Sequence, residues 1–310
     1  MGEWSKKIGE YGEDVVEKFL SIIGWKDPAK GIQIDCLKKN NEHLNEHGKT
    51  VHTHGIDFLY SYMSPLVDGQ LNNIIISSKY KTEKYPNSPT RLFKLFMTDL
   101  INQMECFDLS VTKEDILSSF QFSSINDVGV LFWLNNNANS DDDLLSKIAT
   151  ARIDKINRSS IYIVDNKHAA FILAVLRFLK AKNEYRYSFY YPSTGRNVNP
   201  LRRKNTGAIM PVEYLNSSII PFKLVKINNE MESYLLLASI DCFDKDNFMR
   251  LMGLAKDIST NLSGGIKIAF PDYNDLLHDT IVRQTKQGFN DSEFTKTVSV
   301  INFTDPLSVF

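Results

Sequence analysis

Two neighbouring stretches decide the architecture of this chain: His54-Gly55-Ile56-Asp57-Phe58-Leu59-Tyr60 and Ile74-Ile75-Ile76-Ser77-Ser78-Lys79-Tyr80. Their apolar, β-branched composition predicts strands over 56–62 and 71–80, with turn residues between them. Side chains alternate along a strand, so Ser77 and Lys79 share one face. A lysine in that position suits a pocket at the strand end. The alternative is an edge-strand lysine in solvent.

A helix over residues 5–23 is predicted ahead of these strands. Its apolar side chains recur at helical spacing until Gly24 ends the pattern. Glu10 and Glu17 project almost opposite that stripe, which favours a solvated position for both. Glu13 falls at the edge of the apolar arc, where a carboxylate can look into a cleft or belong to the same solvated face.

The order of the remaining elements indicates an α/β layer with a mixed sheet. Further elements are expected over 31–37 (strand), 90–107 (helix), 128–134 (strand), 141–156 (helix), 160–164 (strand) and 166–182 (helix). The residue composition changes beyond about residue 183, where an aromatic strand over 185–191 precedes a basic loop over 196–204. We therefore expect one domain over residues 1–182 and a smaller α+β domain over 183–310, for recognition or assembly.

Composition restricts the class of protein. The chain has 310 residues, 43% of them hydrophobic and 24% charged, and a net charge of −1. These values are typical of a globular protein, and they require that any nucleic-acid contact come from local basic patches. With no signal-peptide pattern and no apolar run of the roughly 18 residues that a membrane span needs, we expect a cytoplasmic protein without membrane contact.

Cysteine and histidine spacing gives no strong metal signal. Cys36, Cys106 and Cys242 lie far apart and match no zinc motif, so reduced thiols are expected. His43 and His47 have the i, i+4 spacing of some metal sites, but their polar surroundings favour a solvated or DNA-facing loop. His54, three residues before Asp57, is expected close to the chemistry, in contact with nucleic acid.

The chemistry that these residues suit is hydrolysis of a phosphodiester, which needs a cation held by oxygen ligands, an activated water and compensation of phosphate charge. Asp57 and Glu13 supply carboxylates, and the Ser78 backbone carbonyl is a further hard ligand. Lys79 can polarise the water or offset phosphate charge. In the basic loop, Arg202, Arg203 and Lys204 can hold phosphates or form an ordinary charged surface.

The order of these motifs resembles the PD-(D/E)XK nuclease superfamily. Gly9-Glu10-Tyr11-Gly12-Glu13 on the first helix, Gly55-Ile56-Asp57 and Ile76-Ser77-Ser78-Lys79 carry the likeness. It implies a restriction-endonuclease-like αβββαβ core over roughly residues 1–165. It also implies that Asp57 and Lys79 are the motif residues, that Glu13 is the first-helix glutamate and that Mg²⁺, or Mn²⁺ in its place, is the cofactor. The context of Asp57 is most similar to anti-phage defence members.

One position departs from the superfamily pattern. Ser77 stands where a carboxylate is expected, two residues before Lys79. Some restriction enzymes with Ser-x-Lys take the lost carboxylate from the following helix, which makes Asp99 a candidate; Glu83 is closer but is expected in a loop. Two functions follow: a DNA nuclease acting on double-stranded DNA, or a catalytically inactive nuclease-fold subunit that binds DNA or a partner. RNA as substrate, a homo-oligomer and a companion defence subunit remain open.

Overall fold

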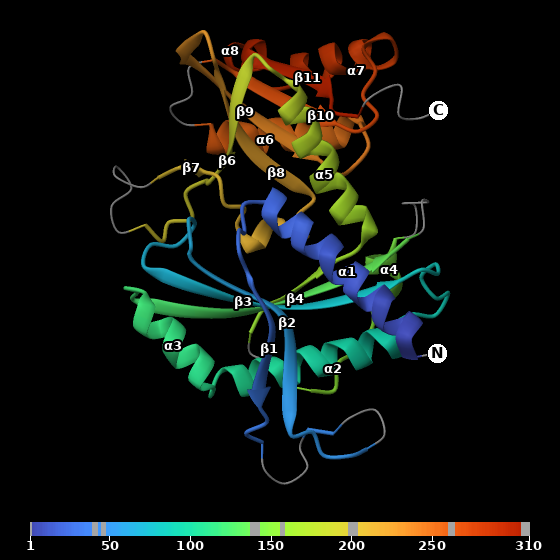
Figure 1. Ribbon diagram of the computed structural model, residues 1–310. Helices are drawn as coiled ribbons and strands as arrows, with labels where there is room; N and C mark the ends of the chain where they lie inside the picture. Colours follow the sequence, from blue (N-terminus) through green and yellow to red (C-terminus); the bar gives the residue numbers. More distant parts are fainter. Residues whose placement is uncertain are drawn as a thin grey trace. The chain divides into compact units, whose positions relative to one another are not determined.

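The computed structural model describes residues 2–38, 43–44, 48–136, 143–155, 159–197, 204–259 and 264–304, with side chains from residue 7 onward. Contacts divide the chain into two compact units (Figure 1). The first comprises Met1–Ala169 together with Pro211–Asn216, and the second comprises Ala170–Met210 and Ser217–Phe310. A short segment far along the sequence is therefore part of the first unit.

The first unit is a five-stranded mixed sheet with helices around it. The strand order is β1-β2-β3-β4-β5, in which β2 is antiparallel to both β1 and β3 while β4 and β5 continue parallel to β3. Its elements are α1 (Gly2–Ile22), β1 (Ala29–Asp35), β2 (Thr53–Met63), β3 (Gln70–Lys81), α2 (Thr90–Phe107), α3 (Val111–Ser119), β4 (Ser124–Asn135), α4 (Leu144–Ile148) and β5 (Ile161–Val164).

Helices α1 and α2 cover opposite faces of this sheet (Figure 1). Phe19 of α1 packs edge-on against Phe132 of β4, at 5.4 Å between ring centroids. Phe96 of α2 packs against the next residue of that strand, Trp133, at 5.1 Å. Because neighbouring side chains of a strand point to opposite faces, the two contacts place the helices on opposite sides. Lys79, which lies near Phe96, faces α2.

The α/β fold with a mixed sheet is confirmed, and α2 has the bounds expected from its periodicity. The helix expected over 141–156 was wrong in extent, since α4 ends at Ile148. Beyond it, Lys155 forms an ion pair with Glu105 of α2, and this tertiary contact replaces helical bonding. Helix α3 was not expected; it is capped by the Ser110 side chain, which accepts from the Lys113 N–H. No helix in the described ranges has an apolar segment long enough to span a membrane.

The second unit is a six-stranded mixed sheet of order β11-β10-β9-β8-β6-β7. Strands β6, β8 and β9 are antiparallel, whereas β10 and β11 continue parallel to β9. The elements are α5 (Asn166–Ala181), which begins in the first unit, β6 (Tyr185–Tyr190), β7 (Thr206–Gly207), β8 (Ile219–Lys226), β9 (Asn229–Ser239), α6 (Lys245–Ile258), β10 (Ile266–Phe270), α7 (Asp275–Gln287), α8 (Ser292–Thr297) and β11 (Val298–Asn302). The 3-10 turn η1 (Val212–Tyr214) belongs to the first unit.

The two units share one topology. Each has a helix, three antiparallel strands, a second helix and then strands parallel to the third, with β6, β8, β9, β10 and β11 in the positions of β1 to β5. The periodic patterns of the sequence show no repeat, so this duplication is visible only in the strand order. The αβββαβ core thus occurs twice in the chain.

Candidate active site

Asp57 lies on β2, next to β3. Its Oδ2 accepts a hydrogen bond from the Ser78 backbone N–H at 2.6 Å. Burial raises the pKa of the Asp57 carboxyl above its ordinary value, although the Ser78 N–H and the charge of Lys79 act in the opposite direction. Ionisation of this carboxyl, between the two predicted motif strands, is therefore less favourable than in an unfolded chain.

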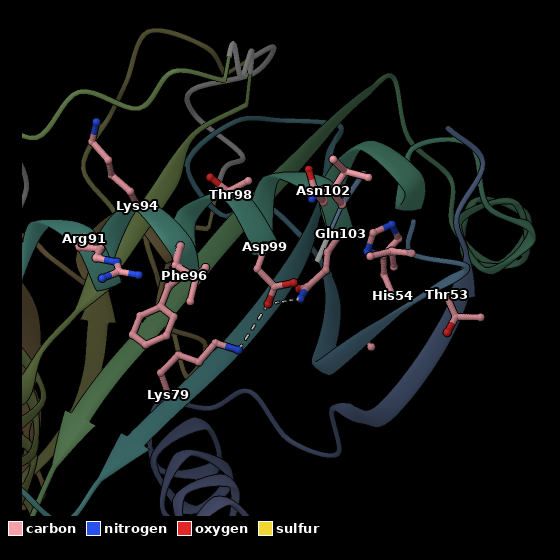
Figure 2. A pocket seen from close by; sticks show the side chains of 14 residues that line it. Thr53, His54, Lys79, Arg91, Lys94, Phe96, Thr98, Asp99, Asn102 and Gln103 are labelled. Atoms are coloured by element: carbon pink, nitrogen blue, oxygen red, sulfur yellow. Dashed lines mark hydrogen bonds and ion pairs between the residues drawn. The ribbon is translucent and has the colours of Figure 1, made fainter. Parts of the chain in front are cut away.

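Lys79 and Asp99 face each other from β3 and α2. The Lys79 Nζ lies 3.4 Å from Asp99 Oδ2, and the same oxygen accepts from Gln103 Nε2 at 3.2 Å (Figure 2). The charge of Asp99 also contributes to the raised pKa of Asp57. Glu83, the other candidate for the missing carboxylate, is exposed just after β3. Of these two acidic side chains, Asp99 is the one beside Lys79.

Ser77 occupies the position expected for a carboxylate. It is fully buried, and its Oγ has no hydrogen-bond partner at bonding distance in the described part of the chain. The hydroxyl still lies close enough to lower the pKa of Asp57, a smaller effect than that of burial. A buried hydroxyl without a strong partner is unusual, and it marks a polar spot beside Asp57.

Glu13 approaches this spot from α1. Burial raises its pKa first, and the negative charge of Asp57 raises it further. The helix comes close because Gly12 lacks a side chain: a Cβ there would lie 2.3 Å from the Cβ of Tyr80. By contrast, Glu17 is engaged in an ion pair with Lys30. The structure thus brings Glu13 into the electrostatic neighbourhood of Asp57.

A cavity of about 610 Å³ opens beside Lys79 and Asp99 (Figure 2). Its wall includes two further cations of α2, Arg91 and Lys94, which the sequence reasoning missed. The sequence did contain a signal for these two cations. Cations near the beginning of a helix are unfavourable because they oppose its dipole, and α2 has no acidic residue in its first turn to offset them. His54 of β2 also lines this cavity.

The remaining predicted site residues are His54, Ser78 and the side chains of the basic loop. His54 is 4% exposed, and its Nε2 lies 3.0 Å from Nδ1 of His43. Ser78 contributes its N–H to Asp57, while its carbonyl as a metal ligand stays a prediction. Lys204 is exposed in the second unit, and Arg202, Arg203 and His47 lie outside the described residues. A nucleic-acid role for these side chains stays a prediction.

These residues fit a hard divalent cation. Two carboxylates, Asp57 and Glu13, have raised pKa values, and the buried Ser77 Oγ lacks a strong partner. A cation offsets the cost of holding two negative charges close together, and oxygen ligands are those that Mg²⁺ prefers. The donor set therefore agrees with a magnesium-type site.

A helix carrying a glutamate, followed by an aspartate strand and a lysine strand in an αβββαβ core, defines a domain of the PD-(D/E)XK nuclease class. The family described as "GAPS4 protein PD-(D/E)XK nuclease domain" matches residues 1–168, more than half of the chain, and the protein belongs to this family. No curated protein and no solved structure matches the chain. Members of this nuclease class generally use divalent metals.

Proposed function

We propose that this protein is a metal-dependent nuclease that hydrolyses DNA phosphodiester bonds, with Asp57, Lys79 and Glu13 as its catalytic residues. The observation that carries the proposal is the convergence of Asp57 and Lys79 on adjacent strands, close enough for the lysine charge to act on the pKa of the aspartate. Asp57, Glu13 and the Ser78 carbonyl would hold Mg²⁺ or Mn²⁺. The bound ion would supply Lewis-acid stabilisation of the phosphate and a more acidic water.

Lys79 offsets the charge that develops on the phosphate and orients the attacking water. Its ammonium is already directed by Asp99 at 3.4 Å and by the Phe96 ring, whose centroid is 5.7 Å away. Such contacts lower the entropic cost of holding a long side chain in one position. Asp99 is also the carboxylate that we propose in place of the one lost at Ser77.

Substrate binding is proposed along the cavity beside Lys79, where Arg91 and Lys94 can contact phosphates. Double-stranded DNA is the favoured substrate, and Arg202, Arg203 and Lys204 of the basic loop are proposed as additional contacts. The family name and the sequence context of Asp57 support a role in anti-phage defence, and the cytoplasm is the proposed location. A second copy of the chain or a companion subunit is the proposed partner for the domain over 183–310.

A second function is favoured by one observation, the serine at position 77. The chain would then be a catalytically inactive nuclease-fold subunit that binds DNA or a partner. Because Asp57, Lys79 and Glu13 are all present, we place this alternative second.

The two functions are separated by a cleavage assay. Linear and circular double-stranded DNA, and RNA of the same sequence, are incubated with the purified protein and Mg²⁺ or Mn²⁺. We expect DNA cleavage that EDTA abolishes and that Lys79→Ala lowers on the order of 100-fold or more. Cleavage that persists in Lys79→Ala would reject the assigned site. DNA binding without cleavage, in the presence of an extract from infected cells as well as alone, would favour the inactive subunit.

The role of Glu13 has a matched control on the same helix. Glu13→Gln is expected to lower turnover by at least about tenfold, since it removes a charge beside Asp57. Glu10→Gln, one helical turn earlier, should have little effect, because it leaves in place the Glu13 carboxyl, whose pKa the charge of Asp57 raises. Equal small effects of the two substitutions would mean that Glu13 is a solvated surface residue without a catalytic role.

A further inference from the structure

Four potential metal ligands converge in the first unit, away from the carboxylates of the active site. Cys36 follows β1, His43 lies in the segment between β1 and β2, His54 is on β2, and Cys106 is near the end of α2. One ligand atom from each of the four lies within 4.8 Å of the others. Three of the four side chains are buried, and Cys36 is half-buried.

Four of the six separations between these atoms are close to those of a tetrahedral cage, and the other two, from the sulfurs to His54, are within 4.8 Å. The Cys36 and Cys106 sulfurs are 4.0 Å apart, and they lie 3.4 Å and 3.5 Å from His43 Nδ1, which is 3.0 Å from His54 Nε2. For zinc bonds of about 2.3 Å to sulfur and about 2.0–2.1 Å to nitrogen, a tetrahedron requires about 3.8 Å, about 3.5 Å and about 3.3 Å for the corresponding separations. The sulfur separation is also nearly twice the length of a disulfide bond, about 2.05 Å.

Hydrogen bonding alone does not satisfy this cluster. The other ring nitrogen of His43, Nε2, lies 2.9 Å from Glu105 Oε2, which can only accept a hydrogen bond when ionised; in the tautomer with the proton on Nε2, Nδ1 has a lone pair. Two thiols and the His54 ring all approach this single lone pair. A cation at the centre of the four atoms satisfies every one of them at once.

The surroundings of His43 are those of a metal-bound imidazole. Glu105 accepts from His43 and forms an ion pair with Lys155 at 2.9 Å. A carboxylate behind a ligating histidine fixes the ring orientation and strengthens the ligand. The Nζ of Lys155 also lies 3.1 Å from His43 Nε2. Because the Lys155 ammonium can donate to Glu105, His43 Nε2 can donate to the same carboxylate.

We propose that Cys36, His43, His54 and Cys106 bind one structural Zn²⁺ ion. Two thiolates and two imidazoles form a closed tetrahedral set, which is typical of structural zinc and unlike the oxygen ligands of Mg²⁺. The site ties the segment between β1 and β2 to the end of α2. It thereby supports the cavity wall that contains Leu44 and Val51. His54 becomes a metal ligand in place of the nucleic-acid contact predicted from the sequence.

Metal content tests this assignment without any nuclease measurement. Protein from zinc-supplemented cultures is dialysed against metal-free buffer and analysed by mass spectrometry for its elements. We expect about one zinc ion per chain in the wild type and in Cys242→Ser, whose exposed cysteine lies outside the cluster. The double variant Cys36→Ser, Cys106→Ser should retain less than about a tenth of that content.

Two further measurements remain informative if the double variant fails to fold. Replacement of zinc by Co²⁺ in the wild type should give the visible absorption of a tetrahedral site and a thiolate charge-transfer band. Cys36→His should keep zinc and weaken that band, because one imidazole replaces one thiolate. Zinc-free wild-type protein, iron in place of zinc, full zinc content in the double serine variant or a Cys36–Cys106 disulfide in unreduced protein would each overturn the proposal.

Discussion

Asp57 carries a charge that the folded protein holds at a cost. Burial raises its pKa, and the neighbouring Asp99 adds to that effect. A raised carboxyl pKa means that the folded state binds its proton more tightly than the unfolded chain does. The Asp57 carboxyl therefore stabilises the folded state only at low pH, where it is protonated. This contribution is lost as the pH rises through the raised pKa. At neutral pH the metal-free site destabilises the fold.

Asp57→Asn should therefore raise the melting temperature of the metal-free protein at pH 7. The amide oxygen can still accept from the Ser78 N–H, while the buried charge is gone. Each kcal/mol gained corresponds to about 2–4 °C for a unit of this size. The advantage should vanish as the pH falls below about 3.8, where the wild-type aspartate is protonated in both states.

The metal dependence of the same variant completes this test. Mn²⁺ should raise the melting temperature of the wild type and leave that of Asp57→Asn unchanged, because binding to the folded state alone stabilises it. Thermal unfolding with and without Mn²⁺ measures both effects. An equal Mn²⁺ shift in the two proteins would remove Asp57 from the ligand set.

At the scale of the element, the position of α1 depends on one glycine. Gly12→Ala would bring a Cβ to 2.3 Å from the Tyr80 Cβ, so the helix must shift away from β3. We expect a loss of about 1–3 kcal/mol in the free energy of unfolding. Turnover should fall as well, since Glu13 moves with the helix, and a displacement of about 1 Å can cost on the order of 100-fold.

Gly9→Ala on the same helix is the control for this substitution. A Cβ at Gly9 meets nothing within 4 Å, so alanine should stabilise the helix by about 0.5–1 kcal/mol and leave turnover unchanged. Urea unfolding and cleavage rates measure both variants. Similar behaviour of the two would mean that α1 does not pack against Tyr80 in solution.

The beginning of α2 is expected to bind phosphates through Arg91 and Lys94. The double change to alanine should weaken DNA binding and reduce the slope of log K against log salt by about one for each cation removed. Lys26→Ala with Lys84→Ala, two exposed lysines that do not line the cavity, is the control. DNA-binding titrations at several salt concentrations compare the two double variants. An unchanged slope of log K against log salt in the α2 variant would argue against DNA binding in the cavity.

At the scale of the whole molecule, the first unit is completed by the distant segment Pro211–Asn216. Val212 and Leu215 are fully buried, and the Val212 N–H donates to the Tyr62 hydroxyl of β2 at 2.9 Å. The first unit is therefore closed by residues that a linear division of the chain at residue 182 assigns to the second domain.

Tyr62→Phe should lower the free energy of unfolding by about 1–3 kcal/mol, because it leaves the buried Val212 N–H without its acceptor. Tyr11→Phe, which removes an exposed tyrosine hydroxyl, is the control and should change it by less than about 0.5 kcal/mol. Chemical denaturation of the full chain measures the difference. No difference between the variants would show that the segment is not held by this bond.

The proposed active site has no counterpart at the corresponding sheet edge of the second unit. In the second unit, the edge that corresponds to Asp57 and Lys79 is formed by the start of β8 (219–222) and the end of β9 (235–239). These residues include no carboxylate and no lysine. We therefore expect Lys79→Ala to remove all cleavage by the protein, and the second unit to act as a silent copy of the fold.

The sequence by itself determined most elements of the first unit, apart from α3 and the extent of α4, and it predicted the closeness of Asp57 to Lys79. Apolar periodicity is a local property, and two consecutive antiparallel strands bring their facing ends together without further information. The edge position of Glu13 was also inferred from helical geometry; its side chain is exposed in the structure, and its role in the site stays a prediction. Local patterns were sufficient wherever the partners lie within one hairpin or one helix.

Only the tertiary structure decided which distant residues meet. Asp99 reaches Lys79 because α2 packs across β3, and Cys36, His43, His54 and Cys106 converge from four separate segments. Their spacing along the chain matches no zinc motif, so sequence reasoning left the cysteines as plain thiols. Pro211–Asn216 joined the first unit in the same way. Contacts between residues far apart in sequence leave no periodic pattern in the sequence, because they depend on the packing of whole elements against one another.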